Sequence, residues 1–250
     1  DLGLDGAAIA LTLSRFILAG VALRFAIGTH NLLAVPRWRT ISRVWRPYFV
    51  IAMPAMLTQI STPLGNYLLT GVIAEFGDDA VASWAVINRL TVVAFGGIFS
   101  LSGAIGGIYG QNFGAGQFDR LRLIFRDSLV FCIGYTLVAW ALLSLSANWM
   151  IGVFGLSGEG AEVYRAFALI GSAGFVLVGA LFVSNATFNS LGKPMRSTFC
   201  NWTRDGLLML PAAWLGAAWF AAPGVVYAQA VAGGLAGLLA AIWSWYFLKG

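Results

Sequence analysis

Long uninterrupted apolar runs dominate this chain and restrict what it can fold into. Most approach the ~20 residues that a helix needs to cross the hydrocarbon core of a bilayer. Backbone groups in lipid find no water to bond, so such runs must form helices that satisfy these groups internally. Charged residues make up 10% of the chain and hydrophobic residues 59%, whereas a soluble domain carries about 25% charged residues. The sequence therefore predicts an all-α integral membrane protein.

About seven membrane-spanning helices are expected from the number and length of these runs. Short segments rich in glycine, aspartate and proline separate them, as is typical of turns; examples are 76–79, 155–158 and 191–194. The expected spans are 4–27, 47–74, 80–109, 128–154, 163–188, 207–222 and 225–248.

Basic residues are concentrated in every second loop between spans, and this alternation predicts which side of the membrane each loop faces. The linker after the first span, the loops after the third and fifth spans and the end of the chain are basic, whereas the intervening loops hold mainly acids. Because basic loops stay cytoplasmic, we expect the amino end outside and the carboxyl end in the cytoplasm. The net charge of +5 thus reports topology and needs no nucleic-acid partner. The basic positions are Arg37, Arg39, Arg43, Arg46, Arg120, Arg122, Arg126, Lys193, Arg196, Arg204 and Lys249.

Enzymatic chemistry is not expected. The one histidine, His30, lies in a polar linker, which excludes a histidine metal site within this chain. Cys132 and Cys200 are interpreted as small core residues, because two cysteines make no disulfide framework. No Ser/His/Asp or Cys/His arrangement can be built, and no cofactor is expected. The chain opens on Asp1 without methionine or a signal peptide, so we expect a fragment.

Polar residues inside the second span form the first candidate site. Gln59, Thr62, Asn66 and Tyr67 recur at helical spacing, so they can share one face. Polar groups are costly to bury in lipid, which makes them default candidates for a substrate pathway. We interpret this face as a cavity wall; hydrogen bonding between helices is the alternative.

Two further spans carry polar candidates. Asn88 and Arg89 lie within the third span, and Arg89 has no acidic neighbour in sequence. Its side chain either reaches the outer leaflet or faces inward and pairs with a distant carboxylate. Asn185 and Asn189 lie four residues apart on the fifth span and can face the same cavity. A helix C-terminal cap explains Asn189 equally well.

No carboxylate is expected deep inside a span. Asp127 and Asp205 are placed at the cytoplasmic starts of two helices, where a carboxylate suits the helix N-terminus. Glycines four residues apart indicate close helix packing in lipid. They are Gly103 and Gly107, the set Gly106, Gly110 and Gly114, and Gly233 and Gly237.

An internal echo indicates repeat architecture, which is typical of secondary transporters. Residues 6–11 and 224–229 each come after an outer turn. Each segment begins with a glycine and continues with small or β-branched residues. The first span, within 1–27, would then end one repeat. A basic cytoplasmic linker, 28–46, would lead to a complete six-helix lobe, 47–250. Chance similarity of two Gly/Ala-rich helices is the alternative.

Four segments resemble the multidrug and toxic compound extrusion (MATE) family. Residues 110–116 read GQNFGAG and are similar to a turn that closes a span in the family. Residues 188–196 resemble the loop after its tenth helix, 53–55 the start of the seventh and 224–229 the twelfth. The resemblance covers the chain as helices six to twelve of a twelve-helix protein.

The resemblance implies a bacterial plasma-membrane exporter of organic, often cationic, compounds, driven by antiport of sodium ions or protons. Two six-helix lobes would rock about a central cavity, and the amino-terminal lobe would be missing here. Sodium-coupled members carry a glutamate where this chain has Thr62, and an aspartate near 192–194, where it has Gly-Lys-Pro. We therefore expect the coupling carboxylate in the missing lobe.

Three other classes compete with this interpretation. A retinal protein needs a lysine deep in the last helix for a Schiff base, and the last span has none before Lys249. A lipid or glycan-precursor flippase of the same broad superfamily is the main alternative, although only Arg89 offers a cavity cation. A purely structural membrane subunit has less need of buried residues such as Gln59 and Asn185.

Overall fold

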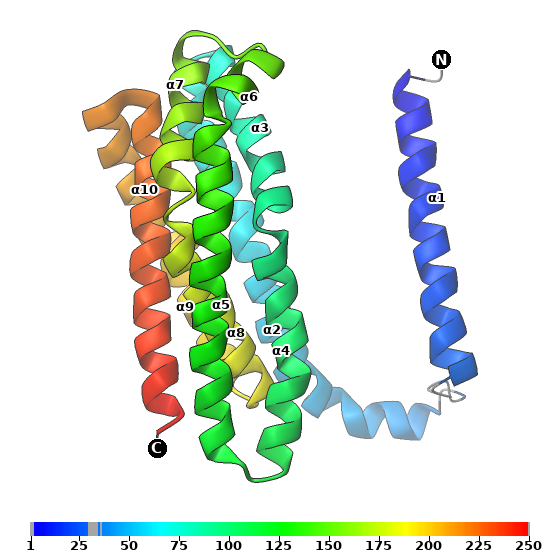
Figure 1. Cartoon of the computed structure of the whole chain (residues 1–250). Helices are drawn as coiled ribbons and strands as arrows, with labels where there is room; N and C mark the ends of the chain where they lie inside the picture. Colours follow the sequence, from blue (N-terminus) through cyan, green and yellow to red (C-terminus); the bar gives the residue numbers. More distant parts are fainter. Residues whose placement is uncertain (1–2, 30–34, 36, 250) are drawn as a thin grey trace. The chain divides into compact units, whose positions relative to one another are not determined.

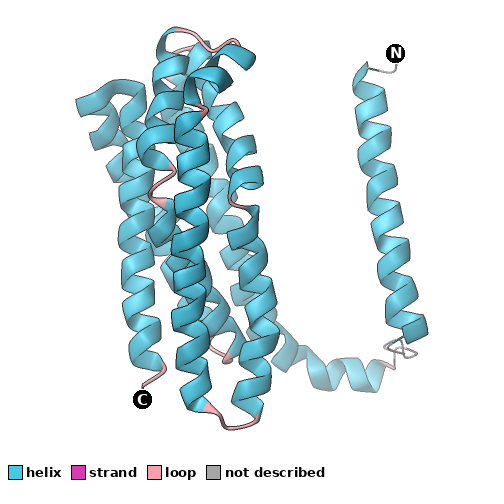
Figure 2. Ribbon diagram, in the orientation of Figure 1, coloured by secondary structure: helices cyan, strands magenta, loops and turns pink. Residues whose placement is uncertain are grey.

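A computed structural model describes residues 3–29, 35 and 37–249 of the protein. Within these residues all regular structure is helical, and short loops join the helices (Figure 2). The expected all-α class is thus confirmed. The chain divides into two compact units, Asp1–Phe49 and Val50–Gly250.

The first unit carries one long apolar helix. Residues Ala8–Gly28 are long and apolar enough to cross a membrane, as expected for the span 4–27. Its large apolar side chains are exposed, with Phe16 at 71%, so the helix requires lipid or another apolar surface around it. The expected linker 28–46 is partly helical, and His30 lies outside the described residues. The elements are α1 (Gly3–Arg24), η1 (Phe25–Thr29) and the first turns of α2 (Trp38–Ala74).

The second unit is a bundle that begins within α2 and runs to the end of the chain (Figure 1). Long helices lie side by side in it, and their loops gather at two opposite ends (Figure 1). The remaining elements are α3 (Asp78–Ala94), α4 (Gly96–Gly114), α5 (Phe118–Leu145), α6 (Ala147–Val153), α7 (Gly158–Ala166), η2 (Phe167–Gly171), α8 (Phe175–Ser190), α9 (Pro194–Trp202), η3 (Thr203–Leu208) and α10 (Met209–Phe247).

Two of the expected spans are bent helix pairs. The expected span 80–109 consists of α3 and α4, which meet at 44°, and 163–188 consists of α7–η2 and α8, which meet at 64°. Glycines next to a break favour such kinks. Gly96 and Gly97 lie at the first break, and Gly171 and Gly174 lie at the second. The breaks also contact each other, because the rings of Phe95 and Phe175 stack at 3.9 Å.

The last two expected spans, 207–222 and 225–248, are two limbs of one long helical stretch. Non-helical backbone at Phe220 and Ala221 separates them, with a positive φ of 53° at Ala221. A Cβ added to Gly216 would collide with the Gly224 carbonyl oxygen, although eight residues of straight helix would hold these positions ~12 Å apart. The chain therefore turns back on itself at 220–221, as the two expected spans require.

By length and apolar composition, three helices can cross a membrane among the described residues, or up to five if each bent pair counts as one span. This is fewer than the expected seven or so. One reason is that Pro194–Phe247 counts as a single helix although it turns back at 220–221. The other is that α2, which holds the expected span 47–74, is interrupted by polar residues and is not among them.

Glycine-mediated packing is found on α10 but hardly on α4. Cβ atoms added to Gly233 and Gly237 would collide with Val178 and the Leu177 backbone of α8, so these two helices approach as closely as expected. Among the α4 glycines that the sequence singled out, only Gly106 has such a neighbour, the Ser190 Oγ at 3.4 Å. The other four glycines of this α4 set have no atom of the described chain within 4 Å beyond their own helix turn, so their expected packing stays a prediction. These are Gly103, Gly107, Gly110 and Gly114.

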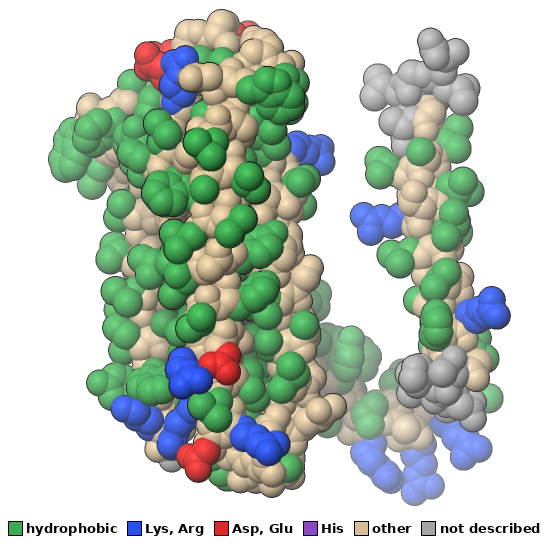
Figure 3. Space-filling view, viewed as in Figure 1, with side chains coloured by type: hydrophobic (Ala, Val, Ile, Leu, Met, Phe, Trp, Pro, Cys, Tyr) green, Lys and Arg blue, Asp and Glu red, His purple; other side chains and the backbone are tan. Residues whose placement is uncertain are grey.

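The two ends of the second unit differ in charge (Figure 3). The end with the α4–α5 and α8–α9 loops, here the basic end, holds Arg120 and Lys193. The opposite, acidic end holds Asp79, and Ser157 Oγ donates a 2.9 Å hydrogen bond to its Oδ2. Apolar side chains cover the surface between the ends (Figure 3), as a helical bundle in lipid requires.

Candidate functional site

Two cavities lie in the second unit and share a wall. The ion-pair cavity, of about 470 Å³, is lined by Arg204 and Asp205 together with mainly apolar residues. The amide cavity, of about 400 Å³, is lined by uncharged polar residues, among them Asn201. Thr62 and Phe182 line both cavities, so these two side chains stand between them.

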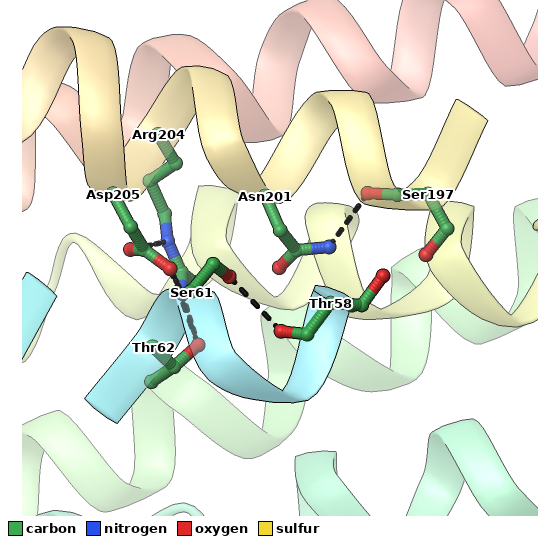
Figure 4. Close-up of polar contacts among 7 residues, drawn as sticks. All are labelled: Thr58, Ser61, Thr62, Ser197, Asn201, Arg204 and Asp205. Carbon is green, nitrogen blue, oxygen red and sulfur yellow. Dashed lines mark hydrogen bonds and ion pairs between the residues drawn. The ribbon is translucent and has the colours of Figure 1, made fainter. Parts of the chain in front are cut away.

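A closed hydrogen-bond network joins Arg204, Asp205 and Thr62 (Figure 4). Arg204 Nε and Nη2 donate to Asp205 Oδ1 and Oδ2 at 2.6 and 2.9 Å. Arg204 Nη2 also donates to Thr62 Oγ1 at 2.9 Å, and Thr62 Oγ1 donates to Asp205 Oδ2 at 3.2 Å. The side chains of Arg204 and Asp205 are 8% and 5% exposed. The pair is therefore bidentate and buried, and it links η3 to α2.

The local backbone explains how two adjacent residues pair. In an α-helix, neighbours i and i+1 do not face each other. Arg204 and Asp205 lie in η3, a π-helical stretch between α9 and α10, and such stretches are frequent at functional sites. Close approach of α2 also matters, since a Cβ added to Gly65 would lie 3.1 Å from Asp205 Cβ. A side chain at position 65 would crowd the carboxylate.

Further polar bonds hold α9 against α2 next to this network. Thr198 Oγ1 donates to the Pro54 carbonyl at 2.9 Å and lies 2.9 Å from Thr58 Oγ1. Trp202 Nε1 donates to the Leu57 carbonyl at 3.1 Å. The polar face of α2 therefore bonds to a neighbouring helix and also lines cavities, so both interpretations of the second span hold in part.

Most of the predicted pathway residues line one of the two cavities. Only Tyr67 and Arg89 line neither; Tyr67 is 75% exposed, and Arg89 is exposed with no ion pair to any described residue. That exposure favours the interpretation in which Arg89 reaches outward. In the ion-pair cavity the predicted residues are Thr62, Asn66 and Asn88, and in the amide cavity they are Gln59, Thr62, Asn185 and Asn189.

The central pair was missed from the sequence. Arg204 was assigned to a basic loop and Asp205 to a helix N-terminus, and both assignments are wrong because the two residues are buried inside a continuous helical stretch. The assignment of Asp127 is also wrong: α5 begins at Phe118, and Asp127 pairs with Arg126 on the surface. A detectable signal was the face formed by Ser197, Asn201 and Arg204–Asp205 at spacings of four and three to four.

The amide cavity contains unsatisfied polar atoms. Asn185 Oδ1 and Ser197 Oγ are buried and have no hydrogen-bond partner in the described part of the chain. Asn201 Nδ2 donates to the Ser197 carbonyl at 2.8 Å (Figure 4). Buried polar atoms are normally satisfied, often by water, so this cavity suits water or the polar part of a ligand.

Metal or cofactor chemistry finds few ligands here. Among residues 3–29, 35 and 37–249, no three His, Cys, Asp or Glu side chains are grouped as a metal site would require. Cys132 and Cys200 are buried and unpaired with each other. What the arrangement does offer is a small-molecule cavity with a buried ion pair on its wall.

A multi-pass helical bundle with polar cavities at helix breaks is the architecture of a membrane transporter. Residues 54–215 match the model of the MatE family, and the chain belongs to that family. A crystal structure of a mutant MATE transporter VcmN from Vibrio cholerae matches all of this chain and 57% of its own, with a TM-score of 0.87 and 25% identity. The family contains transporters rather than enzymes.

Two curated relatives agree with this assignment. One is a "FAD transporter" from Shewanella oneidensis, 28% identical over 86% of this chain and 48% of its own length. The other is the "probable multidrug resistance protein YoeA" of Bacillus subtilis, 24% identical over 59% of this chain and 32% of its own. The chain thus spans half or less of these relatives' length, consistent with the carboxy-terminal portion that the resemblance implied.

Proposed function

We propose that the protein containing this chain is a secondary transporter that exports organic compounds, cationic ones among them, in exchange for protons or sodium ions. MatE membership together with the ion-pair cavity carries this proposal. The volume of the ion-pair cavity, about 470 Å³, lies within the ~300–1,000 Å³ usual for small-molecule pockets.

The lining of the ion-pair cavity supports a flat, partly apolar substrate. Phe99 and Phe175 supply aromatic walls, and Asn66, Asn88 and Gln229 add hydrogen-bonding groups. Aromatic walls with a few placed polar groups are typical of ligand sites. Arg204 and Asp205 neutralise each other, so in this state the cavity carries no net charge.

Transport further requires the second lobe. We propose that this chain forms one wall of a central pathway, and that it rocks against an amino-terminal lobe of the same polypeptide. The small residues on the exposed face of α4, which no described atom covers, suit a surface that slides against that lobe. The bacterial origin of the relatives supports a location in a bacterial plasma membrane, and the positive-inside rule supports an orientation with the basic end in the cytoplasm.

Efflux measurements test this function. The complete reading frame is expressed in a drug-sensitive bacterium, and efflux of ethidium, a fluorescent organic cation, is followed with and without a sodium gradient. Energy-dependent efflux that stops when the ion gradient collapses is expected. Asn66→Ala should reduce it, whereas Gln117→Ala, an amide in an exposed loop outside both cavities, should not. Absence of efflux for a panel of organic cations, from protein shown to be inserted, would favour a lipid-linked substrate instead.

A further inference from the structure

Stability of the bundle alone does not explain the buried Arg204–Asp205 pair, because an apolar pair could hold the helices together equally well. Burying two charges carries a large desolvation cost, and apolar replacements often serve stability as well or better. Ionisable residues inside membrane-spanning segments are therefore functional candidates by default. Asp205 lines the ion-pair cavity, as do Gln229 and Met209, so it can respond to an ion or a substrate there.

Thr62 connects Asp205 to the amide cavity. Its hydroxyl donates to Asp205 Oδ2, and the same side chain lines both cavities. A hydroxyl can donate one proton while it accepts another. Thr62 is thus placed to pass a proton between the amide cavity and the carboxylate.

The amide cavity leads from Thr62 toward the basic end. It is bordered by Asn189 and Ser190 in the last turn of α8 and by Ser197 in the first turn of α9. Water molecules that conduct a proton can occupy this cavity, because it is polar and roomy and holds the unsatisfied atoms Asn185 Oδ1 and Ser197 Oγ. No charged side chain lines it in the described part of the chain, so no fixed charge blocks a proton.

We propose that Asp205 is a proton-binding site of this lobe, loaded through water in the amide cavity with Thr62 as the relay. A water-borne proton reaches the Thr62 hydroxyl, the hydroxyl passes its own proton to Asp205 Oδ2, and it keeps the incoming one. The inference rests on the proposed transport function and assigns its coupling ion.

A proton suits this carboxylate better than a sodium ion. Both Asp205 oxygens already accept hydrogen bonds from the Arg204 guanidinium, at 2.6 and 2.9 Å. A metal ion would have to displace that cation and gather several oxygen ligands. A proton needs neither space nor further ligands, and Thr62 already directs a hydrogen toward Oδ2.

Asp205 is the one carboxylate among the described residues that line the ion-pair cavity. Arg204 of η3 is the one charged group facing it among the described residues that line the cavity; α2 contributes Thr62 and Gly65. The cavity residues from α10 and α8 are uncharged and do not titrate: Met209, Gln229, Ala230, Gly233, Phe175, Val178 and Phe182.

Protonation would change the charge of the cavity and thereby its affinity for cations. With Asp205 ionised, the network is neutral; with Asp205 protonated, Arg204 leaves a net positive charge. An organic cation then binds less well, because like charges repel strongly in a medium of low dielectric constant. Substrate cation and proton thus exclude each other at one site, which is the condition for exchange.

Purified full-length protein in proteoliposomes tests this inference. Wild type is expected to accumulate ethidium against its gradient when a proton gradient is imposed, and also to exchange labelled for unlabelled substrate without any gradient. Asp205→Asn should lose the proton-driven accumulation and weaken the exchange, because the unpaired Arg204 keeps the cavity positive. The double variant Arg204→Gln/Asp205→Asn, whose network is neutral, should lose the accumulation and keep the exchange. Asp127→Asn, which removes an exposed surface carboxylate, should keep both. If wild type transports no cation, the proposed function fails; if Asp205→Asn keeps proton-driven accumulation, only this inference fails.

Two more measurements keep the test decisive if Asp205→Asn folds poorly. Infrared difference spectra of wild type, recorded between high and low pH, should contain a protonated-carboxyl band that substrate addition reduces. The double variant Arg204→Gln/Asp205→Asn, which leaves no unpaired charge, should lack that band. Thr62→Val should slow proton uptake in stopped-flow experiments and Thr62→Ser should not. A substrate-sensitive carboxyl band that persists in the double variant, or equal uptake rates in the two Thr62 variants, would overturn the assignment.

Discussion

At the residue scale, Arg204 and Asp205 each depend on the other to compensate a buried charge. Removing one partner of a buried pair leaves an uncompensated charge, which costs about 3–5 kcal/mol. Arg204→Met should therefore lower the thermal stability of the detergent-solubilised protein strongly, because Asp205 would keep its burial and lose two hydrogen bonds. Thermal unfolding followed by intrinsic fluorescence measures this.

The matched control is the surface pair Arg126–Asp127, whose side chains are 63% and 64% exposed. Arg126→Met should change stability by less than about 1 kcal/mol. The double variant Arg204→Met/Asp205→Leu should recover most of the loss, since it removes both charges. Equal melting temperatures for Arg204→Met and Arg126→Met would show that the buried pair does not behave as one unit.

Gly65 offers a second test at this scale. A Cβ at position 65 would lie 3.1 Å from Asp205 Cβ, so Gly65→Ala should displace the carboxylate from Thr62 and reduce transport. Gly71→Ala on the same helix meets nothing within 4 Å and should be neutral or stabilising by up to about 1 kcal/mol. Transport rate normalised to the amount of inserted protein distinguishes the two; equal rates would mean that α2 yields at position 65.

At the scale of elements, packing of α8 on α10 depends on glycine. A Cβ on Gly237 would collide with the Leu177 carbonyl oxygen, so Gly237→Ala must push the helices apart. Overpacking of this kind costs about 1–3 kcal/mol. Gly134→Ala on the exposed face of α5, with nothing within 4 Å, is the control and should not destabilise. Detergent melting curves compare them, and a neutral Gly237→Ala would show that the α8–α10 contact is loose.

The same scale shows what sequence could and could not predict. Apolar run length and the existence of a turn between the last two spans were readable, because lipid requires helices of one length and the chain between them is short. The turn lies at 220–221, a few residues before the expected break at 223–224. The bends at Phe95 and near Ser172 were not: glycines at a kink and glycines at a packing surface look alike in sequence, and the neighbouring helix decides between them.

The buried pair escaped prediction for a related reason. Hydropathy treats Arg204 and Asp205 as two free charges, so the expected span began after them, at 207. In the structure they neutralise each other inside a helical stretch. Asn66 and Asn185 could be singled out from the sequence, because single amides are costly in lipid wherever they point, and each lines one of the two cavities. It could not give a pairing that depends on the local π-helical geometry.

At the scale of the whole molecule, the described chain leaves much apolar surface uncovered. Phe16 of α1 and the side chains of Val92 and Val93 on α3 are 71%, 63% and 78% exposed. Lipid can cover an apolar face. The wall of a transport pathway carries polar and apolar groups side by side, and lipid does not suit the polar ones. The open α4 face, where Gly103 lines the amide cavity and Gly107 has nothing within 4 Å, is a surface of this mixed kind.

We therefore expect this 250-residue chain to behave poorly alone and well with the remainder of the protein. Expressed alone in detergent, it should aggregate or elute as a mixture of sizes, because the α4 face and the amide cavity wall stay open to water. Coexpressed with the remaining segment of the reading frame, it should elute as one monodisperse complex with a higher melting temperature. Size-exclusion chromatography with light scattering measures both. A monodisperse, thermally stable preparation of the chain alone would mean that this lobe closes its own pathway face, and the proposed rocking of two lobes would then need another surface.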